Sequence, residues 1–538
     1  MQKKLSKIFL AILILLMANC ANRGMPQGGE KDIEPPKVVK SEPNNYSTNF
    51  NGKEIEIYFD EYIKLKDLQK QLIISPPMNT QPEILPLGGA SKRITIKIFD
   101  TLKPNMTYAF NFGQSVVDNN EENPFPFYRF VFSTGDHIDS LTVSGRILDA
   151  ERRKPEEFVS VMLYEKDSVF SDSIVYKEFP KYITNTLDST TTFTLENLKA
   201  GTYKLIALKD QNTNNKFEQS SDKIGFKEGF ITIPSDSVFY DLTLFKEEQD
   251  FKFIRASQIS GSRISFGYAG NVDNMTIDLI SDKPEGFKHR ITKDSKADTL
   301  YYWHTPKFQT DSIIFNVSNK TFNFKKDSIV VRIKDMYKDS LTIDIKPKGN
   351  IVFNEDLIIS GSIPLEKFDK SLVEFINKDS LNVDFDFRKD SINNQFIISF
   401  DKEEAQVYNM QLLPGAILDM FENTNDTINH VLRTKTYLDY GNLRVILQNA
   451  VYPLIVQLTD DKGQVLLEEY TDKPEPVDFN NLSPRKYFVR VVYDSNANKK
   501  WDSGNYLEQR QPERISYYPE EVDVRSGWDE LLDFKLLD

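Results

Sequence analysis

The chain has 538 residues, which is several times the length of one β-sandwich and implies roughly four or five domains of about 100 residues each. Hydrophobic residues make up 39% and aromatic residues 12% of the chain, which excludes wholesale disorder, and 25 prolines and 23 glycines suit many turns. The formal net charge of -13, from 80 acidic and 67 basic residues, repels phosphate backbones and excludes nucleic acid as an expected partner.

Residues 1–19 have the layout of a secretory signal peptide. Three lysines precede the apolar run 8–17, and the small residue Ala18 is followed by Asn19 and Cys20. A run of that length spans only about 15 Å as a helix, half of the hydrocarbon thickness, which excludes a permanent transmembrane span. Because Cys20 is the only cysteine of the chain, disulfides and thiolate metal sites are excluded together.

The segment that ends at Cys20 resembles a bacterial lipoprotein signal, which is cleaved just before a cysteine whose thiol is then acylated. The resemblance implies lipidation of Cys20, although Asn19 and Met17 are not the commonest residues at their positions. Each buried methylene of an acyl chain is worth about 0.8 kcal/mol, so two or three chains, palmitate among them, hold a folded ectodomain at a bilayer. An ordinary signal with an incidental cysteine is the alternative.

Residues 20–36 form a tether that is rich in Gly, Pro and charge and lacks apolar periodicity, so it is expected to be flexible. The acidic run 28–32 before Pro35 and Pro36 resembles the export signal of Bacteroidota lipoproteins. That resemblance implies a lipid-anchored protein of the outer membrane, on its periplasmic or cell-surface face, with the cell surface favoured.

Segments with period-two alternation follow the tether and recur along the chain, for example at 55–59, 94–98 and 130–132. They indicate half-buried antiparallel strands and an all-β fold. The stretch 37–136 resembles the SbsA-type bacterial Ig-like family. The residues that carry the resemblance are Phe59, Asp60, Glu61, Tyr108, Asp118 and the closing strand 130–134.

A second pattern follows at 137–247 and resembles prealbumin-like or carboxypeptidase-regulatory-like β-sandwiches. Its ladder runs from Leu198 through Tyr203 to Asp210, and the same spacing returns in 438–538. A looser Ig-like copy occupies 349–437, on Tyr408, Asp419 and Thr434, whereas 248–348 is a β-rich domain of no named family. Internal duplication of a two-domain unit is the simplest account of tandem Ig-like and prealbumin-like β-sandwiches.

The most specific chemical feature is a loop that follows each prealbumin-like ladder and places side-chain oxygens at positions one, three, five and nine. This spacing resembles the Ca²⁺ loops of EF-hand and dockerin type, in which a backbone carbonyl at position seven, here Lys216 or Lys500, completes the set. Neither loop has Gly at position six, and Ser221 and Asn505 stand where a bidentate Glu is usual at position twelve. The candidate ligands are Asp210, Asn212, Asn214 and Glu218 in the first loop and Asp494, Asn496, Asn498 and Asp502 in the second.

Asx turns that only shape a tight connection are the alternative interpretation of both loops. The neighbouring aromatic residues Trp501, Tyr506, Tyr517 and Tyr518 are candidates for an exposed patch that binds a glycan or a protein, although such residues in a sandwich are more often buried.

Catalytic motifs are missing from the sequence. The four histidines, His137, His289, His304 and His430, are scattered and lack paired metal-ligand spacing, and the sequence has neither a Gly-x-Ser-x-Gly elbow nor a nucleophilic cysteine. No catalytic residue is therefore assigned. A carbohydrate-active enzyme with two carboxylates is kept as the last alternative, because 80 acidic residues offer many pairs.

The sequence therefore predicts a non-enzymatic outer-membrane lipoprotein that acts as an extended interaction scaffold. The expected partners are the membrane, through the lipid anchor, and a protein such as an outer-membrane β-barrel of an assembly, export or uptake machine. A surface adhesin or glycan-binding protein is the alternative.

Overall fold

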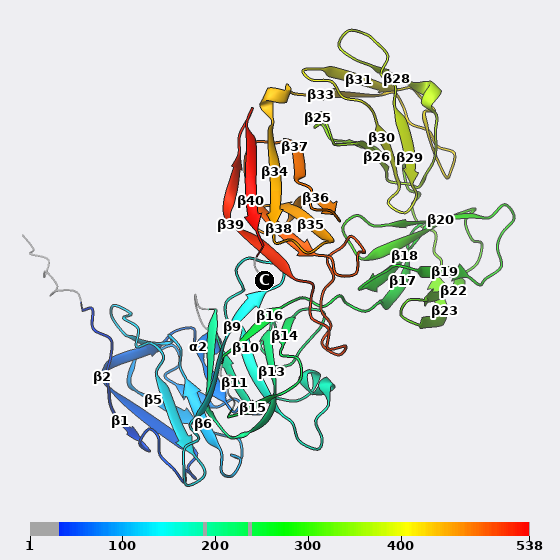
Figure 1. The fold of residues 1–538 in the computed structure, drawn as a ribbon. Coiled ribbons are helices and arrows are strands. Elements are labelled where there is room, and N and C mark those ends of the chain that lie inside the picture. The colour runs from blue at the N-terminus through cyan, green and yellow to red at the C-terminus, as the bar shows by residue number, and fades with distance from the viewer. Residues whose placement is uncertain (1–31, 187–190, 235–238, 537–538) are drawn as a thin grey trace, which may run out of the picture.

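The structure is a computed structural model that describes residues 32–186, 191–234 and 239–536. Its regular elements in these ranges are β1 to β40, the four-residue helix α2 (Leu68–Gln71) and three short 3-10 helices, η1 (Asp172–Tyr176), η2 (Lys370–Leu372) and η3 (Tyr437–Asp439). The strands form five β-sandwiches, which we call modules 1 to 5 in chain order (Figure 1). The all-β prediction is confirmed. Among the described residues, no helix is both long and apolar enough to cross a membrane.

Module 1 packs the sheet β1-β2-β5-β4, with β7 also paired to β2, against the sheet β3-β6-β8. Alternation along the second strand buries Ile55, Ile57 and Phe59 and turns the intervening side chains outward, as a half-buried strand requires. The strands are β1 (Val38–Glu42), β2 (Glu54–Leu65), β3 (Ile73–Ser75), β4 (Glu83–Leu85), β5 (Ser91–Lys97), β6 (Thr107–Asn111), β7 (Val116–Asp118) and β8 (Arg129–Ser133).

Module 4 repeats this order of strands. Its sheet β24-β26-β30-β29 corresponds to β1-β2-β5-β4, its strands β28, β31 and β33 correspond to β3, β6 and β8, and the pair β27-β32 corresponds to the pairing of β2 with β7. The strands are β24 (Ile343–Lys346), β25 (Gly349–Asn350), β26 (Leu357–Gly361), β27 (Leu365–Phe368), β28 (Val373–Ile376), β29 (Asp386–Asp390), β30 (Gln395–Ser399), β31 (Val407–Leu412), β32 (Ile417–Asp419) and β33 (Ile428–Arg433).

Equivalent residues hold equivalent turns in modules 1 and 4. The hydroxyl of Tyr108 accepts the backbone N–H of Lys103 at 2.9 Å, and that of Tyr408 accepts the N–H of Glu403 at 2.6 Å. In the same corner, the hydroxyl of Thr134 accepts the N–H of Met106 at 2.9 Å. The carboxylates of Asp118 and Asp419 each accept backbone N–H groups of the turn that follows them, as in the bonds to Asn123 (2.7 Å) and Phe421 (2.8 Å).

Modules 2 and 5 share a different strand order. Module 2 packs β11-β10-β13-β14, with β15 on β13, against β12-β9-β16, and module 5 packs β36-β35-β38-β39 against β37-β34-β40. In both modules the last strand pairs in parallel with the first. The strands of module 2 are β9 (Leu141–Asp149), β10 (Ser160–Glu165), β11 (Tyr182–Asn185), β12 (Thr192–Leu198), β13 (Gly201–Lys209), β14 (Lys223–Phe226), β15 (Ile231–Ile233) and β16 (Phe239–Leu244). Those of module 5 are β34 (Gly441–Gln448), β35 (Leu454–Thr459), β36 (Val465–Thr471), β37 (Val477–Leu482), β38 (Arg485–Tyr493), β39 (Ile515–Val524) and β40 (Asp529–Lys535).

Module 3 has a third arrangement, in which the sheet β17-β18-β21-β20 faces β19-β22-β23. Its core is rich in aromatic residues, and Phe266 lies 5.1 Å from Phe315 between the ring centroids. The strands are β17 (Lys252–Ser260), β18 (Arg263–Ala269), β19 (Met275–Leu279), β20 (Lys288–Lys293), β21 (Thr299–Thr305), β22 (Ser312–Asn319) and β23 (Phe324–Arg332).

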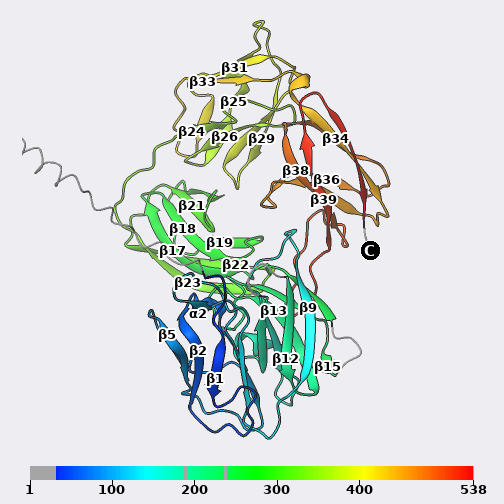
Figure 2. The same ribbon diagram turned by 90° about the vertical axis from the view of Figure 1, so that its left-hand side faces the viewer.

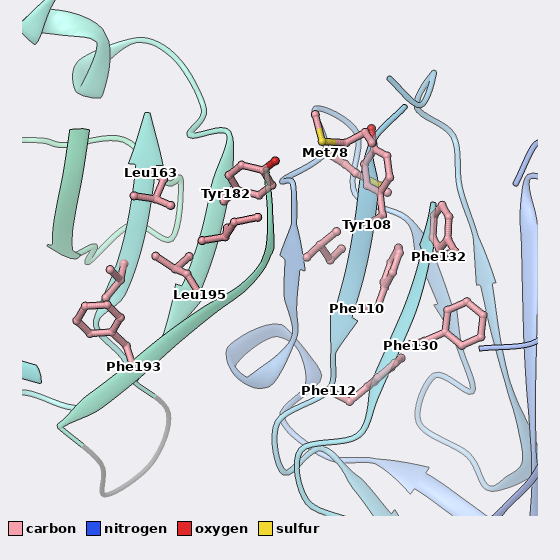
Figure 3. Packing of buried hydrophobic residues seen from close by; sticks show 14 of the residues in the cluster. Met78, Tyr108, Phe110, Phe112, Phe130, Phe132, Leu163, Tyr182, Phe193 and Leu195 are labelled. Carbon is pink, nitrogen blue, oxygen red and sulfur yellow. The ribbon is translucent and has the colours of Figure 1, made fainter. Parts of the chain in front are cut away.

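Modules 1 and 2 are fused through their interiors. One contiguous cluster of buried apolar residues extends from Phe132 and Tyr108 in module 1 to Tyr182 and Leu195 in module 2 (Figure 3). The edge strands β3 and β11 meet at this joint, where the backbone N–H of Ile183 donates to Ser75 Oγ at 3.1 Å. The two modules are therefore expected to behave as one rigid pair.

The chain then turns back on itself. A small apolar cluster that includes Trp303 and Met420 joins modules 3 and 4, and Phe353 stacks on Tyr437, 4.6 Å away between centroids, where module 4 leads into module 5. Module 5 returns to module 2, so modules 2 to 5 follow a closed path (Figures 1 and 2). The extended string of modules that the sequence suggested is therefore wrong for this part of the chain. The residues that close the path are far apart in sequence and give no local signal.

Candidate functional site

The first Asp and Asn loop connects β13 to β14 in module 2. The carboxylate of Asp210 accepts the backbone N–H groups of Asn212 at 3.0 Å and Asn215 at 2.6 Å, which pulls the chain into a tight turn. Thr213 and Asn215 adopt positive φ angles of 53° and 57°, and asparagine tolerates that left-handed region better than most residues. This residue pattern therefore folds locally into a compact loop.

The remaining candidate ligands of this loop converge on one carboxylate. The side-chain amides of Asn212 and Asn214 donate to the two oxygens of Glu218 at 2.7 Å and 2.8 Å. The sequence spacing of alternate residues thus does bring Asp210, Asn212, Asn214 and Glu218 together. In this arrangement the four side chains are bonded to the backbone or to one another.

The second loop, between β38 and β39 of module 5, repeats the geometry. Asp494 accepts the N–H groups of Asn498 at 3.0 Å and Lys499 at 2.8 Å. The amides of Asn496 and Asn498 donate to the same oxygen of Asp502 at 2.5 Å and 2.7 Å. The two loops are therefore structural copies.

Each loop contains a further carboxylate that sequence reasoning missed. Asp222, one residue beyond position twelve, accepts the N–H groups of Gln211 at 3.0 Å and Glu218 at 2.8 Å. A search that allowed the last ligand of the twelve-residue loop pattern to lie one residue later would have found Asp222.

In module 5 the corresponding role falls to Glu513, which accepts the N–H groups of Ser495 at 2.7 Å and Asp502 at 3.1 Å. Glu513 lies 18 residues after Ser495, beyond any twelve-residue pattern. Only the folded loop shows that it belongs to this group.

Burial dominates the electrostatics of the first loop. It raises the pKa of Asp210, and the nearby carboxylate of Asp222 raises it further, while the N–H groups of Asn215 and Asn212 oppose the shift. A cation would relieve this repulsion, and carboxylate and amide oxygens are the ligands that Ca²⁺ prefers. Within the described ranges, however, no group of three or more His, Cys, Asp or Glu side chains is placed to hold a metal ion. A Ca²⁺ ion in either loop would therefore need asparagine and backbone oxygens in addition to the carboxylates of the loop.

The aromatic residues beside the second loop do not form an exposed patch. Tyr506 is fully buried, and Trp501, Tyr517 and Tyr518 are partly buried. Trp501 Nε1 donates to the carbonyl oxygen of Glu513 at 3.0 Å. An exposed patch is therefore not present in the folded chain: Tyr506 packs into module 2, and Tyr517 and Tyr518 lie in β39.

Two of the four histidines are neighbours, because His289 and His304 lie opposite each other on the paired strands β20 and β21, whereas His137 and His430 lie in other parts of the chain. His137 is exposed beside Asp136, and His289 stacks on Tyr302 with centroids 5.0 Å apart. Burial lowers the pKa of His304 and His430. The four therefore share no common site. Cys20 and the predicted signal peptide lie outside the described residues.

Five tandem β-sandwiches define a multi-domain protein of Ig-like architecture. Residues 32–134 match the family model of the bacterial Ig-like domain, which coincides with module 1 and confirms the bacterial Ig-like resemblance for that part of the chain. This is a domain family and not an enzyme family. No curated protein matches the sequence.

Among solved structures, the chain is similar to the S-layer protein rSbsC(31-844), with 11% identity over 91% of this chain and 67% of that chain and a TM-score of 0.15. It is also similar to the Bacillus anthracis TIE protein, with 10% identity over 95% and 76% and a TM-score of 0.14. The BSP domain of a biofilm-associated protein gives 8% identity over 77% and 99% and a TM-score of 0.13. At these identities and TM-scores, the likenesses carry no conclusion on function.

Proposed function

We propose that this chain is a non-enzymatic lipoprotein of the outer membrane, anchored through Cys20 and favouring the cell surface, whose modules form an interaction scaffold. Its proposed partner is an outer-membrane β-barrel that assembles, exports or takes up other molecules. The observation that carries the scaffold role is the direct joining of five sandwiches, each with its own filled core apart from the shared core of modules 1 and 2. Such modules offer edges and end loops for binding rather than one deep catalytic cleft.

Two hollows of the molecule lie where modules meet. One lies at the joint of modules 1 and 2 and is lined by residues such as Ile73 and Phe193, and another lies at the joint of modules 2 and 5, beside Thr243 and Pro512. In the described ranges, no histidine lines either hollow, whereas the carboxylates of Asp149, Glu228, Asp241 and Glu513 line the second.

The lipid anchor is tested directly by metabolic labelling with palmitate. The wild-type protein should incorporate label and fractionate with the outer membrane, whereas Cys20→Ala should incorporate none. Conversion of Lys3 to Gln is the matched control, because it changes the same terminus and leaves the thiol in place. An unlabelled mature wild-type protein would contradict the anchor.

The partner is tested by affinity purification of the wild-type protein through a C-terminal tag. Exposed apolar side chains gather where η3 meets the turn between β39 and β40, because the N–H of Gly527 donates to Tyr440 O at 2.7 Å and that of Asn442 to Trp528 O at 2.9 Å. Leu438 is 77% exposed and Trp528 is 53% exposed there, and they are the side chains most suited to contact a barrel or its loops.

A stoichiometric β-barrel should co-purify with the wild-type protein and be lost with the double variant Leu438→Ser and Trp528→Ser. The matched control is Leu87→Ser with Phe99→Ser in module 1, where the same kind of exposed surface is removed elsewhere. Recovery of no barrel with the wild-type protein would overturn this part of the proposal. Binding to a glycan array would instead support the adhesin alternative, although the aromatic residues suggested for glycan binding do not form an exposed patch.

A further inference from the structure

The loop between β38 and β39 does more than repeat the Asp and Asn geometry. Its second half, residues 501–511, which we call the latch, leaves module 5 and enters module 2. Tyr506 is fully buried there, in the cluster that contains Met162, Phe226 and Phe245. Its ring meets that of Phe226 edge-on, with centroids 5.3 Å apart. The most deeply buried aromatic residue of the latch thus completes a core that belongs to another module.

Backbone and side-chain bonds fix the latch in this position. The N–H of Tyr506 donates to Glu247 Oε1 at 2.6 Å, Lys204 Nζ donates to Gln509 Oε1 at 2.5 Å, and Gln511 Nε2 donates to the carbonyl oxygen of Phe226 at 3.0 Å. At position 504 a Cβ atom would lie 2.6 Å from the ring of Phe245, so only glycine lets the backbone approach so closely. The fit is specific to this segment.

The buried polar groups of the joint between modules 2 and 5 offset much of the stability that the aromatic packing contributes to it. Lys204 is 1% exposed, donates to the neutral amide of Gln509 and lies 5.7 Å from the ring centroid of Tyr506. Glu247 is 3% exposed and is bonded to a backbone N–H and to the amide of Gln219. The hydroxyl of Tyr506 has no hydrogen-bond partner among the described residues. Buried charges held by neutral partners and an unbonded hydroxyl are costly, so the closed joint is held by a narrow margin.

We propose that the latch is a reversible fastening between modules 2 and 5. Joints between domains of one chain resemble transient protein–protein interfaces, and they move unless they are large and hydrophobic. In the closed state Tyr506 fills the core of module 2, and Gln511 of the latch is bonded to the carbonyl oxygen of Phe226 at the end of β14. In the open state Phe226 and Phe245 become accessible, and module 5 stays attached through module 4 and through the bond from Arg490 to Glu151. The closed path of modules 2 to 5 thus has two states. In the closed state, Tyr506 of the same chain occupies the space in the core of module 2.

Distance measurements on the full-length chain test the two states. In a Cys20→Ser background the chain has no other thiol, so Lys154→Cys in module 2 and Asp472→Cys in module 5, both exposed, take spin labels selectively. The chain with an unchanged latch should give one dominant short distance. Tyr506→Ser should broaden the distribution and move it to longer distances, whereas Tyr506→Phe should leave it unchanged, because the removed hydroxyl has no partner among the described residues. A Tyr506→Ser distribution that matches the unchanged chain would overturn the proposal.

Two further measurements keep the test independent of folding defects. Gly504→Val blocks docking without touching the tyrosine, so it should reproduce the open distribution, while circular dichroism of both variants should retain the β signal. A synthetic peptide of residues 501–513 should bind the Tyr506→Ser chain without restoring the short distance between the two labels, because the peptide is not connected to module 5. The same peptide with serine for tyrosine should not bind. Failure of the tyrosine peptide to bind would contradict a pocket that is vacant in the open state.

Reversibility is tested by native-state hydrogen exchange of the wild-type protein. The amide of Tyr506, which is bonded to Glu247, should exchange at least about ten-fold faster than that of Val491 in the centre of β38, because latch opening requires no unfolding of module 5. Equal rates would show that the latch opens only when the module unfolds, and the joint would then be permanent.

Discussion

The guanidinium group of Arg490 donates a hydrogen bond from Nη1 to the carbonyl oxygen of Glu151, 2.7 Å away, although 339 positions separate the two residues. The same side chain donates from Nε to Gln457 Oε1 on the neighbouring strand at 2.7 Å and is only 7% exposed. A strand of module 5 and a turn of module 2 therefore share one buried cation.

Replacement of Arg490 by alanine should lower the free energy of unfolding by about 1.5–3 kcal/mol, because hydrogen bonds of a charged group are lost and buried acceptors are left unpaired. Urea denaturation followed by tryptophan fluorescence, to which Trp501 and Trp528 in module 5 and Trp303 in module 3 contribute, measures the change. The matched control is Arg444→Ala, whose pair with Asp478 is exposed to solvent and should contribute much less to stability. Equal losses for the two variants would show that the contact with Glu151 has no special weight.

The two Ig-like corners predict a second pair of variants. Tyr108→Phe and Tyr408→Phe each remove an acceptor for a backbone N–H and should destabilise the chain by about 1 kcal/mol. Tyr128→Phe is the control in module 1, because the Tyr128 hydroxyl is buried and has no partner among the described residues. Thermal unfolding should show a lower Tm for the first two variants and an unchanged or higher Tm for the third. A fall for Tyr128→Phe would mean that this hydroxyl is bonded in solution.

Glu247 predicts a dependence of stability on pH. Burial raises its pKa above the ordinary value of 4.5, so the native state binds a proton more tightly than the unfolded chain. The resulting stability is fully present below the unfolded pKa and is lost as the pH rises through the folded pKa. Relative to Glu247→Gln, which cannot titrate, the wild-type Tm should therefore fall as the pH rises from about 4.5 through this window. Exposed Glu228→Gln controls for removal of one charge. A constant difference between wild type and Glu247→Gln would contradict the shift.

The Asp and Asn loops predict a response to Ca²⁺. If they bind the ion, Ca²⁺ at about five times its Kd should stabilise the EDTA-treated chain by about 1 kcal/mol per site. Asp494→Ala should abolish the contribution of module 5, and the milder Asp502→Asn should weaken it while keeping the size of the side chain. Because Asp494 is fully buried and bonded to the backbone, its removal also lowers the Tm without Ca²⁺, so only the shift on adding Ca²⁺ is informative. If Ca²⁺ does not change the Tm of the wild-type protein, only the interpretation of the loops as Asx turns remains.

The elements whose signal is local could be predicted from the sequence. Period-two alternation identified the strand that contains Ile55 and Ile57, and the fixed spacing of Tyr203 to Asp210 marked the ladder that Tyr487 and Asp494 repeat. The loop residues Asp210 to Glu218 come together because short-range bonds to the backbone position them.

What escaped prediction depends on contacts between distant segments. Glu513 joins the second loop only because the chain doubles back after the latch. The burial of Tyr506 depends on Phe226, which lies in another module, and no local pattern encodes that pairing. The fusion of modules 1 and 2 through Ile183 and Ser75 likewise arises from two strand edges that happen to meet in space.

The return of module 5 to module 2 also determines how the chain carries mechanical load. Tension applied between module 1 and the end of β40 reaches the contacts of Tyr506 and Arg490 before it reaches modules 3 and 4, because those contacts bridge the two ends of the intervening segment. Modules 3 and 4 therefore bear no tension until the contacts between modules 2 and 5 break. The distance between the two ends of the chain then increases by the length of modules 3 and 4.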